Sequence, residues 1–140
     1  MTIDKATIRT LATSAALRYN IDIPLVFAII DAESSWDPES VNANDPSYGL
    51  MGIEPITAQT YGYIADWTNV SSEDIAKIKD PATNLDIGCH LLSDLLSRND
   101  LWTSVEMYNV GESGYLNDGY RDSAYVSKVQ ILYYYYGGTS

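Results

Sequence analysis

A glutamate, Glu33, stands just after the most apolar run of the sequence. The run is Leu-Val-Phe-Ala-Ile-Ile over residues 25–30, and a segment that is apolar on every side belongs in a core. If a helix ends in such surroundings, burial and the negative end of the helix dipole both raise the pKa of the carboxyl group. A carboxylic acid that is still protonated near neutral pH can act as a general acid. The alternative is an ordinary solvated glutamate at a helix end.

The elements that must position Glu33 are predicted to be helices joined by loops. Apolar residues at helical spacing and capping residues at the starts indicate helices near 7–19, 22–32, 55–62, 71–78, 80–96, 100–108 and 122–136. Residues 34–52 are rich in Ser, Asn, Asp, Pro and Gly, which indicates a long loop with a function. The predicted fold class is therefore all-α, with about seven helices.

The length and composition are those of one globular domain over residues 1–140. The sequence is 46% hydrophobic and 19% charged, and it carries a net charge of −11. Binding to nucleic acid or to an anionic membrane requires clustered cations, and the sequence has no basic run. We therefore expect no nucleic-acid partner and no membrane partner. A polysaccharide remains a fitting ligand, and we expect a monomer.

Other chemistries find little support in the sequence. No cluster of His and Cys has metal-ligand spacing and no glycine-rich phosphate loop occurs, so we expect no metal and no cofactor. The one histidine, His90, and the one cysteine, Cys89, lie in a leucine-rich helical pattern, where packing explains them. The four tyrosines 133–136 favour packing, with a partner or glycan surface as the alternative. The start lacks the features of a signal peptide and no apolar stretch is long enough to span a membrane, so we expect a soluble protein.

Three short motifs occur in an order that resembles a known enzyme core. They are Ala-Glu-Ser-Ser-Trp-Asp-Pro at 32–38, Gly-Leu-Met-Gly-Ile-Glu-Pro at 49–55 and Met-Tyr-Asn-Val-Gly at 107–111. Together they resemble the catalytic core shared by soluble lytic transglycosylases and goose-type lysozymes, including phage enzymes that degrade peptidoglycan. The resemblance extends from about residue 17 to residue 129 and implies a lysozyme-like domain around a glycan-binding groove.

The resemblance also implies roles for individual residues. Glu33 would be the catalytic acid and base, and Tyr108 would lie within hydrogen-bonding reach of it. The substrate-binding residues that it implies are Ser34, Gly49, Leu50, Met51, Tyr108 and Asn109. Plain core packing is the alternative for Met51 and Tyr108.

The sequence departs from the family pattern at two places. Gly52 replaces the Gln of Gly-Leu-Met-Gln, which removes a polar side chain from the expected groove. The family stretch Glu-Thr-x-x-Tyr-Val reads Arg-Asp-Ser-Ala-Tyr-Val at 121–126, so Arg121 stands at the Glu position and Asp122 follows it. Contacts with substrate at both places are therefore in question.

The implied activity is cleavage of the β-1,4 bond between N-acetylmuramic acid and N-acetylglucosamine in peptidoglycan strands. A lytic transglycosylase needs one Glu and forms 1,6-anhydromuramoyl products. The first alternative is an inverting muramidase, which needs a second carboxylate, and the resemblance to goose-type lysozymes implies Glu54 or Asp45 for it. For Glu54, a solvated turn residue before Pro55 is the alternative. Further alternatives are a chitinase-like activity and a non-catalytic module that binds glycan or a partner.

The expected setting is a phage or prophage enzyme. Such a protein would be made in the host cytoplasm and would act on the cell wall in the periplasm or outside, either as a free endolysin or as a virion component.

Overall fold

The computed structural model describes residues 3–139, and helices make up most of them. The elements in chain order are α1 Lys5–Arg18, α2 Ile23–Ser34, β1 Val41–Asn42, β2 Ser47–Tyr48, α3 Pro55–Thr60, α4 Ser72–Lys79, α5 Pro81–Arg98, α6 Leu101–Val110, α7 Glu112–Asp118 and α8 Ser123–Tyr135. The predicted all-α fold class is confirmed.

Capping residues explain where most of the helices begin. The side chains of five caps accept a hydrogen bond from a backbone N–H in the first turn: Asp4, Ser71, Asp80, Asp100 and Asp122. At α4, the side chain of Asp74 in turn accepts a hydrogen bond from the backbone N–H of Ser71, which completes a capping box. Each cap satisfies a donor that the helix itself leaves unpaired, which is why the starts at Ser71, Asp80, Asp100 and Asp122 could be predicted from the sequence. The start of α1 was predicted near residue 7 and lies at Lys5, after the cap Asp4.

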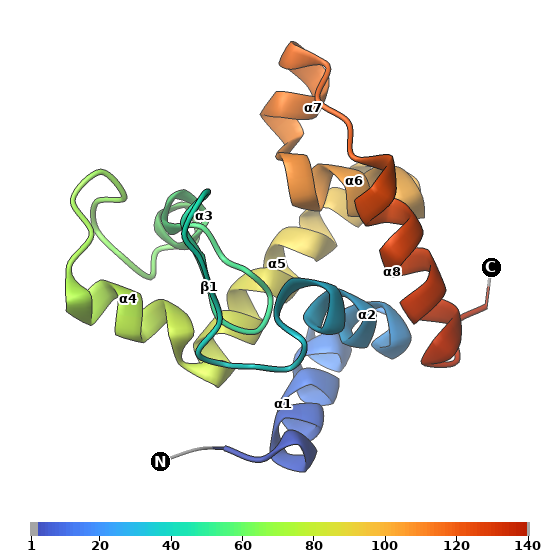
Figure 1. Cartoon of the computed structure of the whole chain (residues 1–140), viewed down its shortest axis with the longest axis horizontal. Helices are drawn as coiled ribbons and strands as arrows, with labels where there is room; N and C mark the ends of the chain where they lie inside the picture. The colour runs from blue at the N-terminus through green and yellow to red at the C-terminus, as the bar shows by residue number, and fades with distance from the viewer. Residues whose placement is uncertain (1–2, 140) are drawn as a thin grey trace.

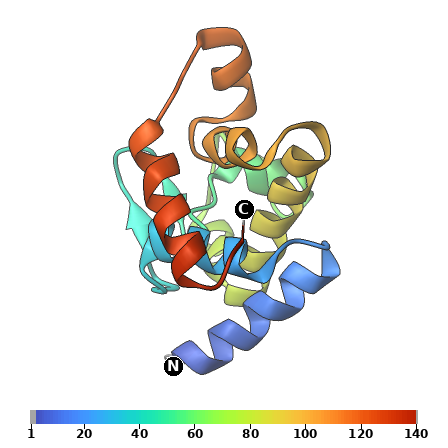
Figure 2. The ribbon, with the colours of Figure 1, turned by 90° about the vertical axis from the view of Figure 1, so that its right-hand side faces the viewer.

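Helix α2 is the buried centre of the fold. Its residues 25–30 are all buried, because α1 packs on one side of it and α8 on another. Figure 2 shows α8 lying across α2. A helix that is apolar all round can be stable only in such a position. Helix α5 packs against α1, α4 and α6, and these contacts join the rest of the chain to the centre.

Two elements differ from the sequence prediction. The expected loop 34–52 contains a small antiparallel hairpin, in which Val41 pairs with Tyr48 and Asn42 with Ser47. Strands of two residues are too short to show an alternating pattern. Residues 112–118 form α7, which was not predicted, so residues 3–139 contain eight helices instead of about seven.

The elements lie on two sides of a centre formed by α2 and α5. Figure 1 shows the hairpin, α3 and α4 on one side, and α6, α7 and the upper part of α8 on the other. The groove described below lies between these two sides. None of the helices in residues 3–139 combines the length with the apolar character needed to cross a membrane.

The tyrosine run at the end of α8 divides between packing and solvent. The hydroxyl of Tyr133 donates to Asp22 at 2.6 Å, and that of Tyr136 donates to Asp31 at 2.6 Å. Tyr134 and Tyr135 are exposed. Tyr133 and Tyr136 therefore connect the end of α8 to α2 and to its preceding residue, Asp22.

Candidate active site

Glu33 lies in the last turn of α2 and is largely shielded from solvent. Its Oε2 accepts a hydrogen bond of 2.7 Å from the hydroxyl of Tyr125. Burial raises the pKa of Glu33 to about 7, against the lowering effects of the Tyr125 hydrogen bond and the positive charge of Lys128, while the charge of Glu54 raises it further. Glu33 is therefore poised to give and to take a proton near neutral pH.

Gly52 leaves the space that the Glu33 carboxyl group occupies. A Cβ atom on residue 52 would collide with Oε1 of Glu33, and the backbone there has a φ of +63°, which favours glycine. Where the family has a Gln, this chain has no side chain, and the carboxyl group of Glu33 lies directly against the backbone of the turn.

The turn 49–52 is held from below by a buried asparagine of α5. The Oδ1 of Asn84 accepts from the backbone N–H of Met51 at 2.8 Å, and its Nδ2 donates to the carbonyl oxygens of Tyr48 and Ile78, each at 2.8 Å. Gly49 opens the turn directly over the amide of Asn84. Asn84 was missed in the sequence, where the only signal was an amide beside a stripe of leucines.

The other residues of the turn point inward. The side chains of Leu50 and Met51 are fully buried. The expectation that they line the groove is therefore wrong for their side chains, and packing explains Met51. Ser34 is also buried, with its Oγ 2.8 Å from the carbonyl oxygen of Leu50 and 2.9 Å from that of Ile30. Ser34 thus ties the turn to α2, and its contact with substrate stays a prediction.

The hydrogen bond to Glu33 comes from a different tyrosine than predicted. Tyr108 is buried under the turn, and its hydroxyl donates to the carbonyl oxygen of Met51 at 2.7 Å. Tyr125 reaches Glu33 because it lies in the first turn of α8, which packs on α2. The signal for Tyr125 was present in the sequence as the Tyr-Val pair of the stretch 121–126.

The residues around Asn109 connect α6 to the start of α8. The Nδ2 of Asn109 donates to Asp122 at 2.8 Å, and the backbone N–H of Asp122 donates to Glu106 at 2.8 Å. Arg121, which stands where the family stretch has a Glu, packs against Tyr115. Its guanidinium group lies 3.5 Å from the centre of the Tyr115 ring and also donates to the carbonyl oxygen of that residue.

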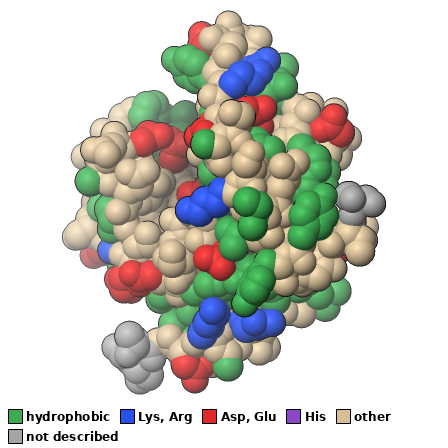
Figure 3. All heavy atoms as spheres, turned by 45° about the vertical axis from the view of Figure 1, so that its right-hand side comes forward, with side chains coloured by type: hydrophobic (Ala, Val, Ile, Leu, Met, Phe, Trp, Pro, Cys, Tyr) green, Lys and Arg blue, Asp and Glu red, His purple; other side chains and the backbone are tan. Residues whose placement is uncertain are grey.

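Two adjoining hollows form a groove that begins between the two sides of the molecule and continues on the hairpin side. One, of about 460 Å³, is lined by Asp45, Glu54, Asn109, Val110, Tyr120, Arg121 and Asp122. The other, of about 330 Å³, is lined by Asp45, Pro46, Tyr48, Glu54, Pro55, Ile56, Trp67 and Val70. Because both include Asp45 and Glu54, the hollows meet at these two carboxylates. Figure 3 shows a face of the molecule that is hollowed, with acidic side chains near the hollow.

The carboxylates of the groove influence one another. Burial and the nearby charge of Asp45 both raise the pKa of Glu54. The charge of Glu54 in turn contributes to the raised pKa of Glu33. The structure thus brings Glu33, Glu54, Asp45 and Asn109 to one region, whereas Leu50, Met51 and Tyr108 lie beneath it.

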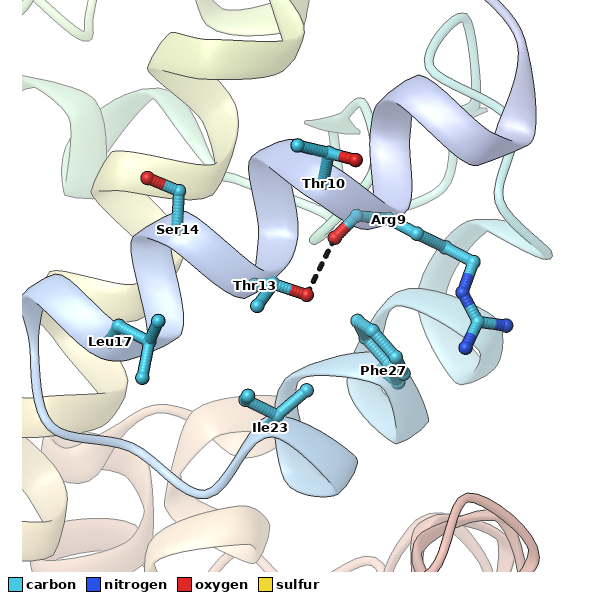
Figure 4. A pocket seen from close by; sticks show the side chains of 7 residues that line it. All are labelled: Arg9, Thr10, Thr13, Ser14, Leu17, Ile23 and Phe27. Atoms are coloured by element: carbon cyan, nitrogen blue, oxygen red, sulfur yellow. Dashed lines mark hydrogen bonds between the residues drawn. The ribbon is translucent and has the colours of Figure 1, made fainter.

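A hollow between α1 and α2 does not suit the same chemistry. It has a volume of about 480 Å³ and is lined by Arg9, Thr10, Thr13, Ser14, Leu17, Ile23 and Phe27. Figure 4 shows that this lining has no carboxylate and that the hydroxyl of Thr13 is bonded to the carbonyl oxygen of Arg9. Across residues 3–139, we find no group of three His, Cys, Asp or Glu side chains that could hold a metal ion.

We predict that replacing Tyr125 with Phe shifts the pH dependence of activity upward. The hydroxyl of Tyr125 stabilises the charged form of Glu33, so its loss raises the pKa of Glu33 above its present value of about 7. If Glu33 acts as an acid, activity falls as the pH rises through this pKa, and the alkaline limb of the profile should move to higher pH.

The matched control for this variant is Tyr135→Phe, since Tyr135 is exposed in the same helix, lies outside the lining of both hollows and has no hydrogen bond to Glu33. The measurement is the rate of peptidoglycan cleavage between pH 5 and 9, which brackets a pKa of about 7. An alkaline limb that stays in place in Tyr125→Phe would contradict the assignment.

Comparisons with known proteins identify the family to which the chain belongs. Residues 10–129 match the family model of the transglycosylase SLT domain. The chain is 30% identical over 126 residues to the membrane-bound lytic murein transglycosylase C of Haemophilus ducreyi, covering 82% of this chain and 34% of the relative. It is 29% identical over 117 residues to a transglycosylase of Enterobacteria phage PRD1, covering 83% of this chain and 39% of the relative. The chain thus spans between a third and two fifths of these relatives, and the resemblance predicted from the motifs is confirmed.

Proposed function

The chain belongs to the transglycosylase SLT domain family, and from this premise we propose that it cleaves the glycan strands of bacterial peptidoglycan. The bond cleaved is the β-1,4 bond between N-acetylmuramic acid and N-acetylglucosamine. One observation carries the proposal: Glu33, with a pKa of about 7, lies against the turn 49–52 and close to the groove carboxylates. Both names among the relatives, a lytic murein transglycosylase and a transglycosylase, support it.

The proposed reaction is a transglycosylation with Glu33 as acid and then base. Protonated Glu33 donates its proton to the glycosidic oxygen as the bond from that oxygen to the anomeric carbon breaks. The resulting carboxylate takes the proton of the 6-hydroxyl group of the same muramoyl residue, whose oxygen bonds to the anomeric carbon. Glu33 is protonated again at the end, and no water is consumed. A pKa near 7 suits both steps.

The neighbours of Glu33 fit this cycle. After the first transfer Glu33 is an anion, and the hydroxyl of Tyr125 donates to it while Lys128 supplies a positive charge. Before the transfer, burial favours the protonated form. Because these effects oppose one another, the pKa of Glu33 stays near 7, and both its protonated and its charged form are accessible at neutral pH.

An inverting hydrolase is the second candidate, because Asp45 and Glu54 line both hollows. In such an enzyme a second carboxylate activates a water molecule, and the two carboxyl groups are typically about 6.5–9.5 Å apart. We favour transglycosylation because both relatives carry that name and because it needs no second carboxylate.

We predict that digestion of peptidoglycan yields mainly 1,6-anhydromuropeptides and that Glu54→Gln changes the rate by less than about tenfold, or ~1.4 kcal/mol of barrier. Glu54 then acts on the chemical step through the pKa of Glu33 and not as a second catalytic carboxylate. The measurement is mass spectrometry of the products formed in ¹⁸O-labelled water. Reducing ends that carry the heavy oxygen, together with a nearly inactive Glu54→Gln or Asp45→Asn variant, would instead identify a muramidase.

We also propose that the chain serves a phage or prophage as a wall-degrading enzyme, either free or within the virion. The relative from phage PRD1 supports this setting. In both cases the enzyme works on the cell wall, in the periplasm or outside the cell.

A further inference from the structure

An exposed tryptophan lies at the end of the groove away from α6 and α8. Trp67 is 46% exposed, as is Ile56 beside it in the lining of the 330 Å³ hollow. The remaining lining there is mostly apolar as well, from Pro46, Tyr48, Pro55 and Val70. Exposing a large aromatic side chain and its apolar neighbours to water is unfavourable, and a ligand that covers them gains the free energy of burying that surface.

The loop that carries Trp67 is held in place before any ligand arrives. This loop, residues 61–71, joins α3 to α4 on the hairpin side of the molecule (Figure 1). The backbone N–H of Trp67 donates to the side chain of Gln59 at 2.8 Å. Asp66 accepts from both the backbone and the hydroxyl of Thr68, at 2.9 and 2.6 Å, and Ile64 is buried. A preordered loop costs little entropy when a ligand binds to it.

The apolar hollow is continuous with the carboxylates of the candidate active site. Its lining shares Asp45 and Glu54 with the hollow at Asn109, and the charge of Glu54 acts on Glu33. A strand that lies against Glu54 in the hollow at Asn109 therefore reaches Trp67 when it continues into the adjoining apolar hollow.

We infer that Trp67 and its apolar neighbours form a sugar-binding subsite that holds one N-acetylated hexose of the same glycan strand. The apolar face of a sugar ring packs on an aromatic ring, and the methyl group of an acetamide fits among prolines and aliphatic side chains. The inference rests on the proposed function, because it takes the occupant to be the strand that Glu33 cleaves.

The occupant is a sugar, not the peptide stem of peptidoglycan. The carboxylates of a peptide stem would be repelled by the only charged groups of this lining, Asp45 and Glu54, and the lining offers no cation to bind them. Strands of N-acetylglucosamine, which carry no peptide, should therefore bind at this subsite.

The test measures binding without cleavage. In the Glu33→Gln background, the affinity for chitohexaose is measured by calorimetry, and the total tryptophan emission, to which Trp36 and Trp102 also contribute, is followed in a parallel titration. We expect Trp67→Ala to weaken binding at least about tenfold, or ~1.4 kcal/mol. Trp67→Phe should retain most of the affinity but lose the change in emission. The matched control is Tyr135→Ala, which removes an aromatic side chain that is 77% exposed at the end of α8 and lies outside the groove lining.

The outcomes separate this inference from the proposed function. Binding that Trp67→Ala leaves unchanged overturns the subsite, and so does an absence of measurable binding to the Glu33→Gln parent at millimolar sugar. An absence of peptidoglycan cleavage by the unchanged protein overturns the proposed function, while the effect of Trp67→Ala on sugar binding still decides the subsite. A drop in melting temperature that is larger for Trp67→Ala than for Tyr135→Ala would assign Trp67 to stability instead.

Discussion

Replacing Glu33 with Gln is expected to abolish cleavage of peptidoglycan while the fold and the binding of glycan remain. The amide keeps the shape of the carboxyl group and can still accept the hydrogen bond from Tyr125, but it cannot give a proton to the glycosidic oxygen. General acid–base catalysis is typically worth about 10²–10⁴-fold in rate, and the loss should be at least that large. The measurement is the fall in turbidity of purified peptidoglycan.

A surface glutamate provides the control for this variant. Glu73 is exposed in the first turn of α4, so Glu73→Gln should keep the activity of the unchanged protein. Both variants should have a melting temperature close to that of the unchanged protein. Full activity of Glu33→Gln would move the catalytic role to another residue, and an inactive Glu33→Gln that no longer folds would be recognised by its lowered melting temperature.

The sequence predicted best those features that depend on neighbours along the chain. Helix α2 could be recognised because the run 25–30 is apolar on every side, and such a run is stable only when other elements cover it. Caps such as Asp80 and Asp100 act within three residues of their own position. The raised pKa of Glu33 followed from the same local reasoning, since burial at the end of α2 is its largest cause.

Features that depend on packing between distant segments could not be predicted. Tyr125 is 92 residues from Glu33, and only the packing of α8 on α2 brings the two together. The motif 49–55 located the turn, but a motif does not say which way a side chain points. Leu50 and Met51 were expected at the groove, with core packing as the alternative for Met51, and both side chains lie in the core. Trp67 was not predicted as a site residue, because a single tryptophan in a loop gives no signal in the sequence until the hollow that it lines is known.

The structure makes Asn84 a residue on which both stability and activity depend. Its side chain is completely buried and satisfies the N–H of Met51 and the carbonyl oxygens of Tyr48 and Ile78. Asn84→Ala leaves these groups without their partner, and each buried polar group left unsatisfied costs about 1–3 kcal/mol. The free energy of unfolding should therefore fall by at least about 2 kcal/mol, as measured by urea denaturation.

The matched control is Asn117→Ala, because Asn117 is an exposed helical asparagine whose side chain donates one hydrogen bond, to Ser113. An equal loss of stability in both variants would contradict the role assigned to Asn84. Activity provides the second measurement. The turn that Asn84 holds places Gly52 against the carboxyl group of Glu33, so a loosened turn also misplaces the catalytic acid. At a temperature where Asn84→Ala is still folded, its rate of cleavage should fall further than its folded fraction, whereas a purely stabilising residue would lower the two in proportion.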